Sequence, residues 1–147
     1  MRFKGKAAGE TPKDSVVEQE PSKGAITEGI TVNIDGTLWH ADTYEVVLMG
    51  KFYIVKGTAS DASVFSIMLP DISGKQTHKV QQGGEVSVTY STDRAKGFLF
   101  FAPFSEDNGW VNTESVDGYL RGTFEVTVNN GAISKLCKGM FSIKLPQ

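Results

Sequence analysis

The chain contains few of the side chains on which metal sites and nucleophilic catalysis depend. Its 147 residues include a single cysteine, Cys137, and two histidines, His40 and His78. One cysteine cannot form a disulfide within the chain, and this set cannot complete a zinc site of the usual Cys and His types. The chain also lacks a P-loop, a dinucleotide-binding fingerprint and an HExxH motif. We therefore expect neither a metal nor a cofactor.

The chain also lacks an excess of charge of one sign and a long hydrophobic run. Fifteen basic and seventeen acidic residues give a net charge of -2, so no strong field would hold a nucleic acid or an anionic membrane. No stretch reaches the roughly 18 apolar residues that indicate a transmembrane helix. No hydrophobic region follows Met1-Arg2-Phe3-Lys4, so we expect no secretory signal in the sequence as written.

Residues 1–29 differ in composition from the rest of the chain. They are rich in Gly, Pro, Ser, Lys and Glu, and no apolar run among them is longer than the pair Val16-Val17. Such a segment cannot bury enough apolar surface to fold by itself. We predict a disordered leader or tether over residues 1–29 and one globular domain over residues 30–147. A short amphipathic helix over residues 14–20 that docks on a partner is the alternative.

From Ile30 onward the sequence shows the two-residue periodicity of β-strands. Between residues 120 and 128, Leu, Gly, Phe and Val alternate with Arg, Thr and Glu, as in a strand with one buried face. Strands are expected at 30–35, 37–41, 44–49, 52–60, 63–69, 85–91, 97–104, 110–116, 119–129 and 133–145. Asp35-Gly36 and Asn129-Asn130-Gly131 are typical of hairpin turns.

Two of the expected strands carry the same short pattern. Gly122-Thr123-Phe124 is similar to Gly139-Met140-Phe141. A glycine permits close approach of the neighbouring backbone, and the aromatic ring two residues later fills space in the core. We interpret the pattern as one packing solution used twice.

The strand pattern predicts the fold class. No window shows a sustained helical stripe of apolar residues, which excludes a parallel βαβ architecture. About 118 residues with eight to ten antiparallel strands are enough for a two-sheet β-sandwich. The sandwich is favoured because strand lengths are uneven and the segment from Asp71 to Gly84 has the composition of a long loop. The alternative is an up-and-down β-barrel of the calycin type.

Two regions of the chain resemble a known family. Residues 34–41, with the sequence IDGTLWHA, contain an Asp-Gly turn and a Trp-x-Ala step, and the two glycine-aromatic strands close the domain. This arrangement resembles an uncharacterised family of small all-β proteins of Bacteroidota, mostly predicted lipoproteins. The resemblance spans roughly Gly29 to Leu145. It implies a location in the periplasm or at the cell surface, and no known activity. It also implies a flexible leader behind a lipidated cysteine, hence a lipid anchor on the full-length precursor. The sequence departs from this pattern, because residues 1–29 contain no lipobox cysteine.

Catalysis has few candidates. A serine hydrolase would need His40 or His78 beside a serine and a carboxylate, and no serine lies in a Gly-x-Ser-x-Gly motif. Cys137 shares its parity with the apolar residues of the last strand, which predicts a buried thiol rather than a reactive thiolate. The acidic segment 105–109 matches no calcium-binding loop and is typical of a solvated turn. We expect no enzymatic activity.

The richest aromatic stretch is the candidate ligand-binding region. It contains Phe98, Phe100, Phe101, Phe104 and Trp110. Three of the phenylalanines share one parity and Phe101 falls on the other, so the expected strand is apolar on both faces. Burial of both faces in the middle of the sandwich is one interpretation. The other is a binding surface for a sugar, a lipid or a partner protein.

Together these features predict a noncatalytic, extracytoplasmic β-domain of a cell-envelope lipoprotein. Its role would be binding or structural, and its partner an unknown ligand or an envelope protein. A β-barrel carrier of a small apolar ligand is a second hypothesis, because the domain has many inward aromatic residues. A hydrolase without a recognisable motif is a third, and it requires a histidine that faces a serine and a carboxylate across a pocket.

Overall fold

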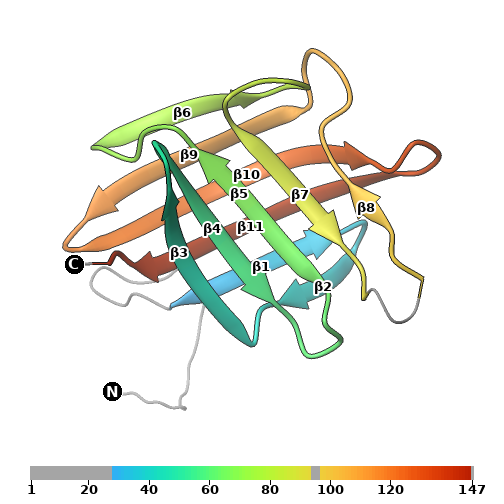
Figure 1. The fold of residues 1–147 in the computed structure, drawn as a ribbon, viewed down its shortest axis with the longest axis horizontal. Coiled ribbons are helices and arrows are strands. Elements are labelled where there is room, and N and C mark those ends of the chain that lie inside the picture. The colour runs from blue at the N-terminus through green and yellow to red at the C-terminus, as the bar shows by residue number, and fades with distance from the viewer. Residues whose placement is uncertain (1–27, 94–96, 147) are drawn as a thin grey trace.

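The computed structural model describes residues 28–93 and 97–146, and these residues form strands and turns without a helix. Eleven strands in this part of the chain build two antiparallel sheets that face each other (Figure 1). The prediction of an all-β, two-sheet sandwich is therefore confirmed. With no helix in the described residues, none of them offers a helical membrane span.

Sheet A has six strands and sheet B has five. The strands of sheet A are β1 (Gly29–Ile34), β2 (Thr37–His40), β6 (Lys75–Val80), β9 (Gly109–Val116), β10 (Tyr119–Asn129) and β11 (Ser134–Lys144). Those of sheet B are β3 (Thr43–Met49), β4 (Phe52–Thr58), β5 (Val64–Leu69), β7 (Ser87–Ser91) and β8 (Phe100–Phe101). Their spatial orders are β2-β1-β11-β10-β9-β6 and β3-β4-β5-β7-β8, and the strands of one sheet run across those of the other (Figure 1).

The predicted domain boundary lies close to the start of the first strand. Strand β1 begins at Gly29, one residue before the expected position. The predicted leader, apart from its last two residues, and the alternative helix over residues 14–20 lie outside the described residues.

The prediction of a long loop between Asp71 and Gly84 is wrong. Strand β6 lies within this segment and pairs with β9, with Lys75 opposite Glu114 and Val80 opposite Gly109. Because β6 is the outermost strand of sheet A, it has a neighbour on one side only, and Val80 is its single buried residue. An edge strand with polar residues on most positions shows little of the apolar alternation by which strands are recognised.

The strand expected at 97–104 is much shorter in the structure. Only Phe100–Phe101 form β8, which pairs with the end of β7 at the edge of sheet B. Phe101 is buried, whereas Phe98, Phe100 and Phe104 are between 42% and 50% exposed. The interpretation that both faces are buried is therefore wrong. The outer face of a sandwich sheet has no layer above it, so only the inward ring of an edge strand can be covered.

A single hydrophobic cluster fills the space between the sheets. Along β1, for example, Ile30, Val32 and Ile34 point inward and are buried. At the centre of the cluster, the ring of Phe65 on β5 lies 5.3 Å from that of Phe124 on β10, measured between centroids. Aromatic pairs at this separation add to the stabilisation that burial provides.

The closed barrel of the alternative fold is not formed. Strands β2 and β6 are the free edges of sheet A, and β3 and β8 are those of sheet B. The carrier hypothesis requires an enclosed lumen, but the interior is occupied by packed side chains. The second sequence-based hypothesis therefore lacks the architecture that it needs.

A buried hydrogen-bond chain links the two sheets. The indole Nε1 of Trp39, on β2 of sheet A, donates to Oγ of Ser63 at 2.7 Å. Ser63 precedes β5 of sheet B, and its hydroxyl donates in turn to the carboxylate of Asp61. Since Ser63 is buried, this chain satisfies polar groups that would otherwise be costly in the interior.

Both predicted hairpin turns are confirmed. Asp35 and Gly36 join β1 to β2 with positive φ angles of 50° and 88°, as the tight turns of two-residue hairpins require. Between β10 and β11, the Asn130 side chain accepts hydrogen bonds from the backbone N–H groups of Ala132 and Ile133. This side chain therefore holds the turn closed.

The repeated glycine-aromatic pattern has a reciprocal geometry. Gly122 on β10 is directly opposite Phe141 on β11, and Phe124 on β10 is directly opposite Gly139 on β11. A Cβ added to Gly122 would meet the ring of Phe141, and one added to Gly139 would lie 2.8 Å from Cζ of Phe124. Each glycine thus leaves room for the ring of the opposite strand, which confirms the interpretation of one packing solution used twice.

Candidate functional site

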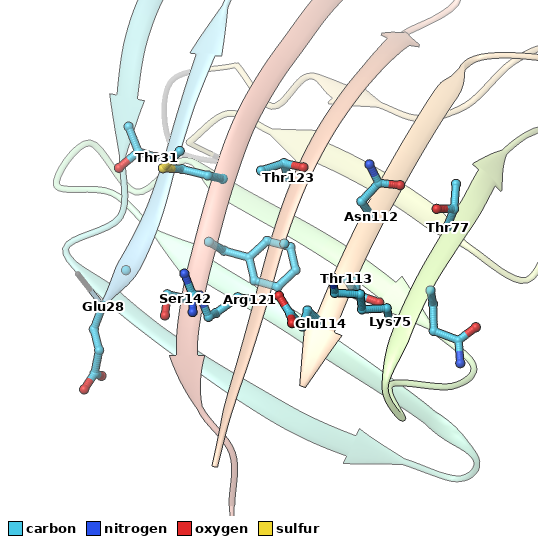
Figure 2. Close-up of a pocket in the computed structure, with 15 residues that line it drawn as sticks. Glu28, Thr31, Lys75, Thr77, Asn112, Thr113, Glu114, Arg121, Thr123 and Ser142 are labelled. Carbon is cyan, nitrogen blue, oxygen red and sulfur yellow. The ribbon is translucent and has the colours of Figure 1, made fainter. Parts of the chain in front are cut away.

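A groove of about 630 Å³ crosses the outer face of sheet A, the face turned away from sheet B (Figure 2). The outward side chains are those that alternate with buried ones. On β10, Arg121 and Thr123 point outward, whereas Leu120 and Phe124 are buried in the core. Because β1, β11, β10, β9 and β6 are neighbours in the sheet, their outward side chains combine into one continuous surface.

Two rows of side chains cross the groove from strand to strand (Figure 2). The strand register places Ser142, Arg121, Glu114 and Lys75 in the first, which we call the charged row. It places Thr31, Met140, Thr123, Asn112 and Thr77 in the second, which we call the threonine row. Residues directly opposite each other on neighbouring strands have Cβ atoms about 5 Å apart, so each row is continuous.

The charged row alternates in sign without closing into ion pairs. Arg121 is opposite Glu114, which is in turn opposite Lys75. Nevertheless, among the residues that the structure describes, the ion pairs with N···O distances up to 4.0 Å do not involve these three side chains. Their guanidinium, carboxylate and ammonium groups therefore keep hydrogen-bonding capacity that a ligand can use.

Ser142 brings a buried hydroxyl to the groove. The residue is only 8% exposed, and within the described part of the chain its Oγ has no hydrogen-bond partner. A buried polar group left unsatisfied costs about 1–3 kcal/mol. Ser142 lies between Gly29 and Arg121 in the sheet. Because this Oγ has almost no accessible surface, a ligand in the groove cannot reach it without a change of the Ser142 rotamer.

Trp110 stands beside the groove on the same face. It lies two residues before Asn112 on β9, hence about 7 Å further along the strand. Its neighbours in the register are Glu125 and Lys79, and 39% of its surface is exposed. Trp110 is not one of the residues that line the groove, but its indole is a flat apolar ring on the same face, one row beyond Asn112.

The structure separates the other sequence-predicted binding residues from the groove. Phe98 and Phe100 stack with ring centroids 6.4 Å apart at the edge of sheet B. Phe101 is buried next to Tyr90, and the exposed Phe104 lies between β8 and β9. The five candidates therefore do not form one surface, and only Trp110 lies on the outer face of sheet A.

The two histidines lie on different strands with different surroundings. His40 on β2 is exposed, and its Nδ1 is 3.9 Å from Oδ1 of Asp42. His78 on β6 has a buried Nε2 that makes no hydrogen bond in the described structure. Burial lowers the pKa of His78, and the negative charge of Asp71 partly opposes this effect. Neither imidazole is hydrogen-bonded to a serine in the described residues, so the arrangement required by the hydrolase hypothesis is not found there.

The acidic loop serves as a turn. The side-chain Oδ1 of Asn108 accepts hydrogen bonds from the backbone N–H groups of Phe104 at 3.1 Å and Ser105 at 2.9 Å. Asn108 is buried and thereby fixes the chain before β9. Across residues 28–93 and 97–146, no group of three or more His, Cys, Asp or Glu side chains could hold a metal ion.

Cys137 is buried in the core, as its parity predicts. Burial raises the pKa of its thiol to about 12, with a smaller contribution from the charge of Asp35.

Because the thiolate is the reactive form, we expect native protein at pH 8 to react with Ellman's reagent on the order of a thousandfold more slowly than urea-unfolded protein. Stopped-flow absorbance measures both rates, and equal rates would contradict the burial of the thiol.

Sequence analysis did not identify the charged row or the threonine row as a site. In the sequence these residues occupy the polar positions of alternating strands, which ordinarily face solvent. Their assembly depends on the pairing of β9 with β6, a strand that the sequence did not reveal. The signal that could have indicated a site is the occurrence of Arg121, Thr123 and Asn112 rather than Lys or Glu alone on central strands.

Comparison with known proteins yields no matching family model, no matching curated protein and no matching solved structure.

Proposed function

We propose that this protein is a noncatalytic binding domain whose ligand lies in the groove on the outer face of sheet A. The observation that carries the proposal is the set of charged side chains in this groove, Arg121, Glu114 and Lys75, which form no ion pair within the described residues. Ligand sites combine a concave shape and apolar surface with a few placed polar groups. Here Met140 and the methyl groups of the threonines supply the apolar surface.

The surroundings of the reactive side chains support a noncatalytic role. The thiol of Cys137 is buried and has a raised pKa, which opposes nucleophilic use. His40 lies on the edge strand β2, and burial lowers the pKa of His78. The groove itself holds unpaired charges but no histidine or cysteine.

A location in the cell envelope is part of the same proposal. It rests on the family resemblance of residues 34–41 and of the two closing strands, which implies an exported, lipid-anchored precursor. A lone buried thiol suits an oxidising compartment, because Cys137 has no second cysteine to pair with inside the chain. An envelope ligand or envelope protein would then be the partner.

Solvent mapping by NMR tests the position of the site. We expect isopropanol and acetamide, added to ¹⁵N-labelled protein, to shift the backbone amide signals of Asn112, Thr123 and Ser142 most strongly. These two probes sample the apolar and the hydrogen-bonding character of a pocket, and ligand sites offer both. Shifts that cluster instead around Phe98 and Phe100 would refute the proposed site.

A pair of variants on one strand provides the control. Thr123→Trp places a large ring in the threonine row, and we expect it to abolish the probe-induced shifts of Asn112. Thr127→Trp carries the same ring on the same face of β10 but outside the groove, and we expect it to leave those shifts unchanged. If both variants, or neither, lose the shifts, the groove is not the site.

A further inference from the structure

We infer that the ligand of this groove is a neutral oligosaccharide that lies across the strands of sheet A and stacks against Trp110. This inference rests on the proposed function, because it names the ligand class of the same groove. The argument has three steps: the hydrogen-bonding character of the groove, its balance of charge and the position of the indole.

The groove offers side-chain rather than backbone hydrogen bonds. Strands β11, β10 and β9 are paired on both sides, so their backbone groups are committed to the sheet. An extended peptide that binds by strand addition needs a free edge, which the floor of the groove does not provide. A ligand must instead match hydroxyl, amide and guanidinium groups such as those of Thr123, Asn112 and Arg121. Sugar hydroxyls both donate and accept, and therefore match all three.

The charges that line the groove balance. Arg121 and Lys75 are opposed by Glu114 and Glu28. A polyanion would meet two carboxylates and a polycation would meet two basic groups, so neither gains a net attraction. A neutral ligand avoids both penalties, and its hydroxyls can hydrogen-bond to each charged group in turn. The charge balance therefore favours an uncharged glycan.

The dimensions and the indole suit a chain of several sugar units. The groove crosses five strands, from Gly29 on β1 to Lys75 on β6, which corresponds to about 19 Å at the usual spacing of strands. Trp110 lies at its border on the same face. The face of an indole ring is electron-rich, and it attracts the C–H groups on the apolar face of a pyranose. The threonine row can then bind the hydroxyls at the ring edge.

Affinity electrophoresis tests the inference. The protein is run in native gels that each contain one neutral polysaccharide: mixed-linkage β-glucan, galactomannan, soluble starch or dextran. We expect at least one of them to retard the wild-type chain. Trp110→Ala and Thr123→Trp should each raise the apparent dissociation constant about tenfold or more, because the aromatic contact at the border or the groove itself is lost. The control Ser66→Trp, which places the same ring on the outer face of sheet B, should migrate like the wild type.

Fluorescence supplies a second readout that loss of fold would not mimic. The chain has two tryptophans, of which Trp39 is 7% exposed and Trp110 is 39% exposed. Binding of the retarding polysaccharide should protect Trp110 from acrylamide quenching. In Trp110→Phe, which keeps an aromatic ring but leaves Trp39 as the only indole, this protection should vanish while retardation in the gel is partly retained.

Several results would overturn the inference. They are the absence of retardation by all four neutral polymers, retardation only by the polyanions alginate or heparin, and wild-type migration of Trp110→Ala in the retarding gel. If these occur while isopropanol and acetamide still map to the groove, the ligand class is wrong but the proposed site stands. If the solvent probes also miss the groove, the proposed function fails with it.

Discussion

Gly139→Ala should lower the free energy of unfolding by about 3 kcal/mol, the upper end of the usual cost of overpacking. On the face of the sheet that meets the core, a Cβ at this position would lie 2.5 Å from the backbone oxygen of Thr31 and 2.8 Å from Cζ of Phe124. The ring can move slightly, but the oxygen belongs to β1, which is paired with β11 along its whole length. Relief of the clash would therefore require the sheet to separate locally.

The sign of this effect distinguishes packing from backbone preference. In most strands, exchange of glycine for alanine stabilises by about 0.5–1 kcal/mol, because glycine loses more conformational freedom on folding. At Gly139 the steric cost exceeds that gain severalfold. Urea unfolding followed by circular dichroism measures the change.

The neighbouring exposed residue provides the control: Lys138→Ala should change the free energy of unfolding by less than about 1 kcal/mol, since its ion pair with Glu125 at 3.9 Å is exposed. Equal stability of Gly139→Ala and wild type would show that the close approach is absent.

The central strands could be predicted from the sequence because their environment is simple. Strands β10 and β11 are long, are paired on both sides and bury one face, so nearly every second residue along them is apolar. The turn that joins them depends on local residues that tolerate unusual backbone angles. Even the glycine-aromatic pairs follow from the sequence, since the short separation and the register place each ring opposite a glycine.

Two of the four edge strands, β6 and β8, could not be predicted in the same way. Strand β6 is polar at most positions, and its pairing with β9 depends on hydrogen bonds of the backbone, which every sequence offers. Conversely, residues 98–104 are strongly apolar, yet only Phe100 and Phe101 pair with β7. Apolar residues are buried only where another sheet or loop covers them. The sequence alone does not indicate which strands lie at the edge of a sheet.

The groove is a product of tertiary arrangement rather than of a local motif. Residues of its charged row come from strands as far apart in sequence as β6 and β11, and no spacing rule joins Lys75 to Ser142. Of the five aromatic residues predicted to bind a ligand, Trp110 alone lies on the groove's face. A sequence-based search favours clustered aromatics, whereas a sheet builds its surface from every second residue of several strands.

Phe65→Ala is expected to have the largest effect of any single truncation, a loss of about 4 kcal/mol of unfolding free energy. Phe65 lies on β5 of sheet B and is 1% exposed. Its ring is 5.8 Å from that of Trp39 and 5.3 Å from that of Phe124, both on sheet A. Its removal leaves a cavity at the point where the two sheets meet, and neither sheet can close around it without breaking its own strand pairing.

Two comparisons separate the contribution of the ring from that of hydrophobicity in general. Phe65→Leu keeps most of the volume and should cost roughly 1–2 kcal/mol, which includes the loss of the aromatic contacts. Phe100→Ala removes the same ring from a position that is 50% exposed and should cost about 1 kcal/mol or less. Denaturant titrations of the three variants give these values. If Phe100→Ala proved as destabilising as Phe65→Ala, the rings near β8 would belong to the core after all, and exposure of the ring would not decide the cost of its removal.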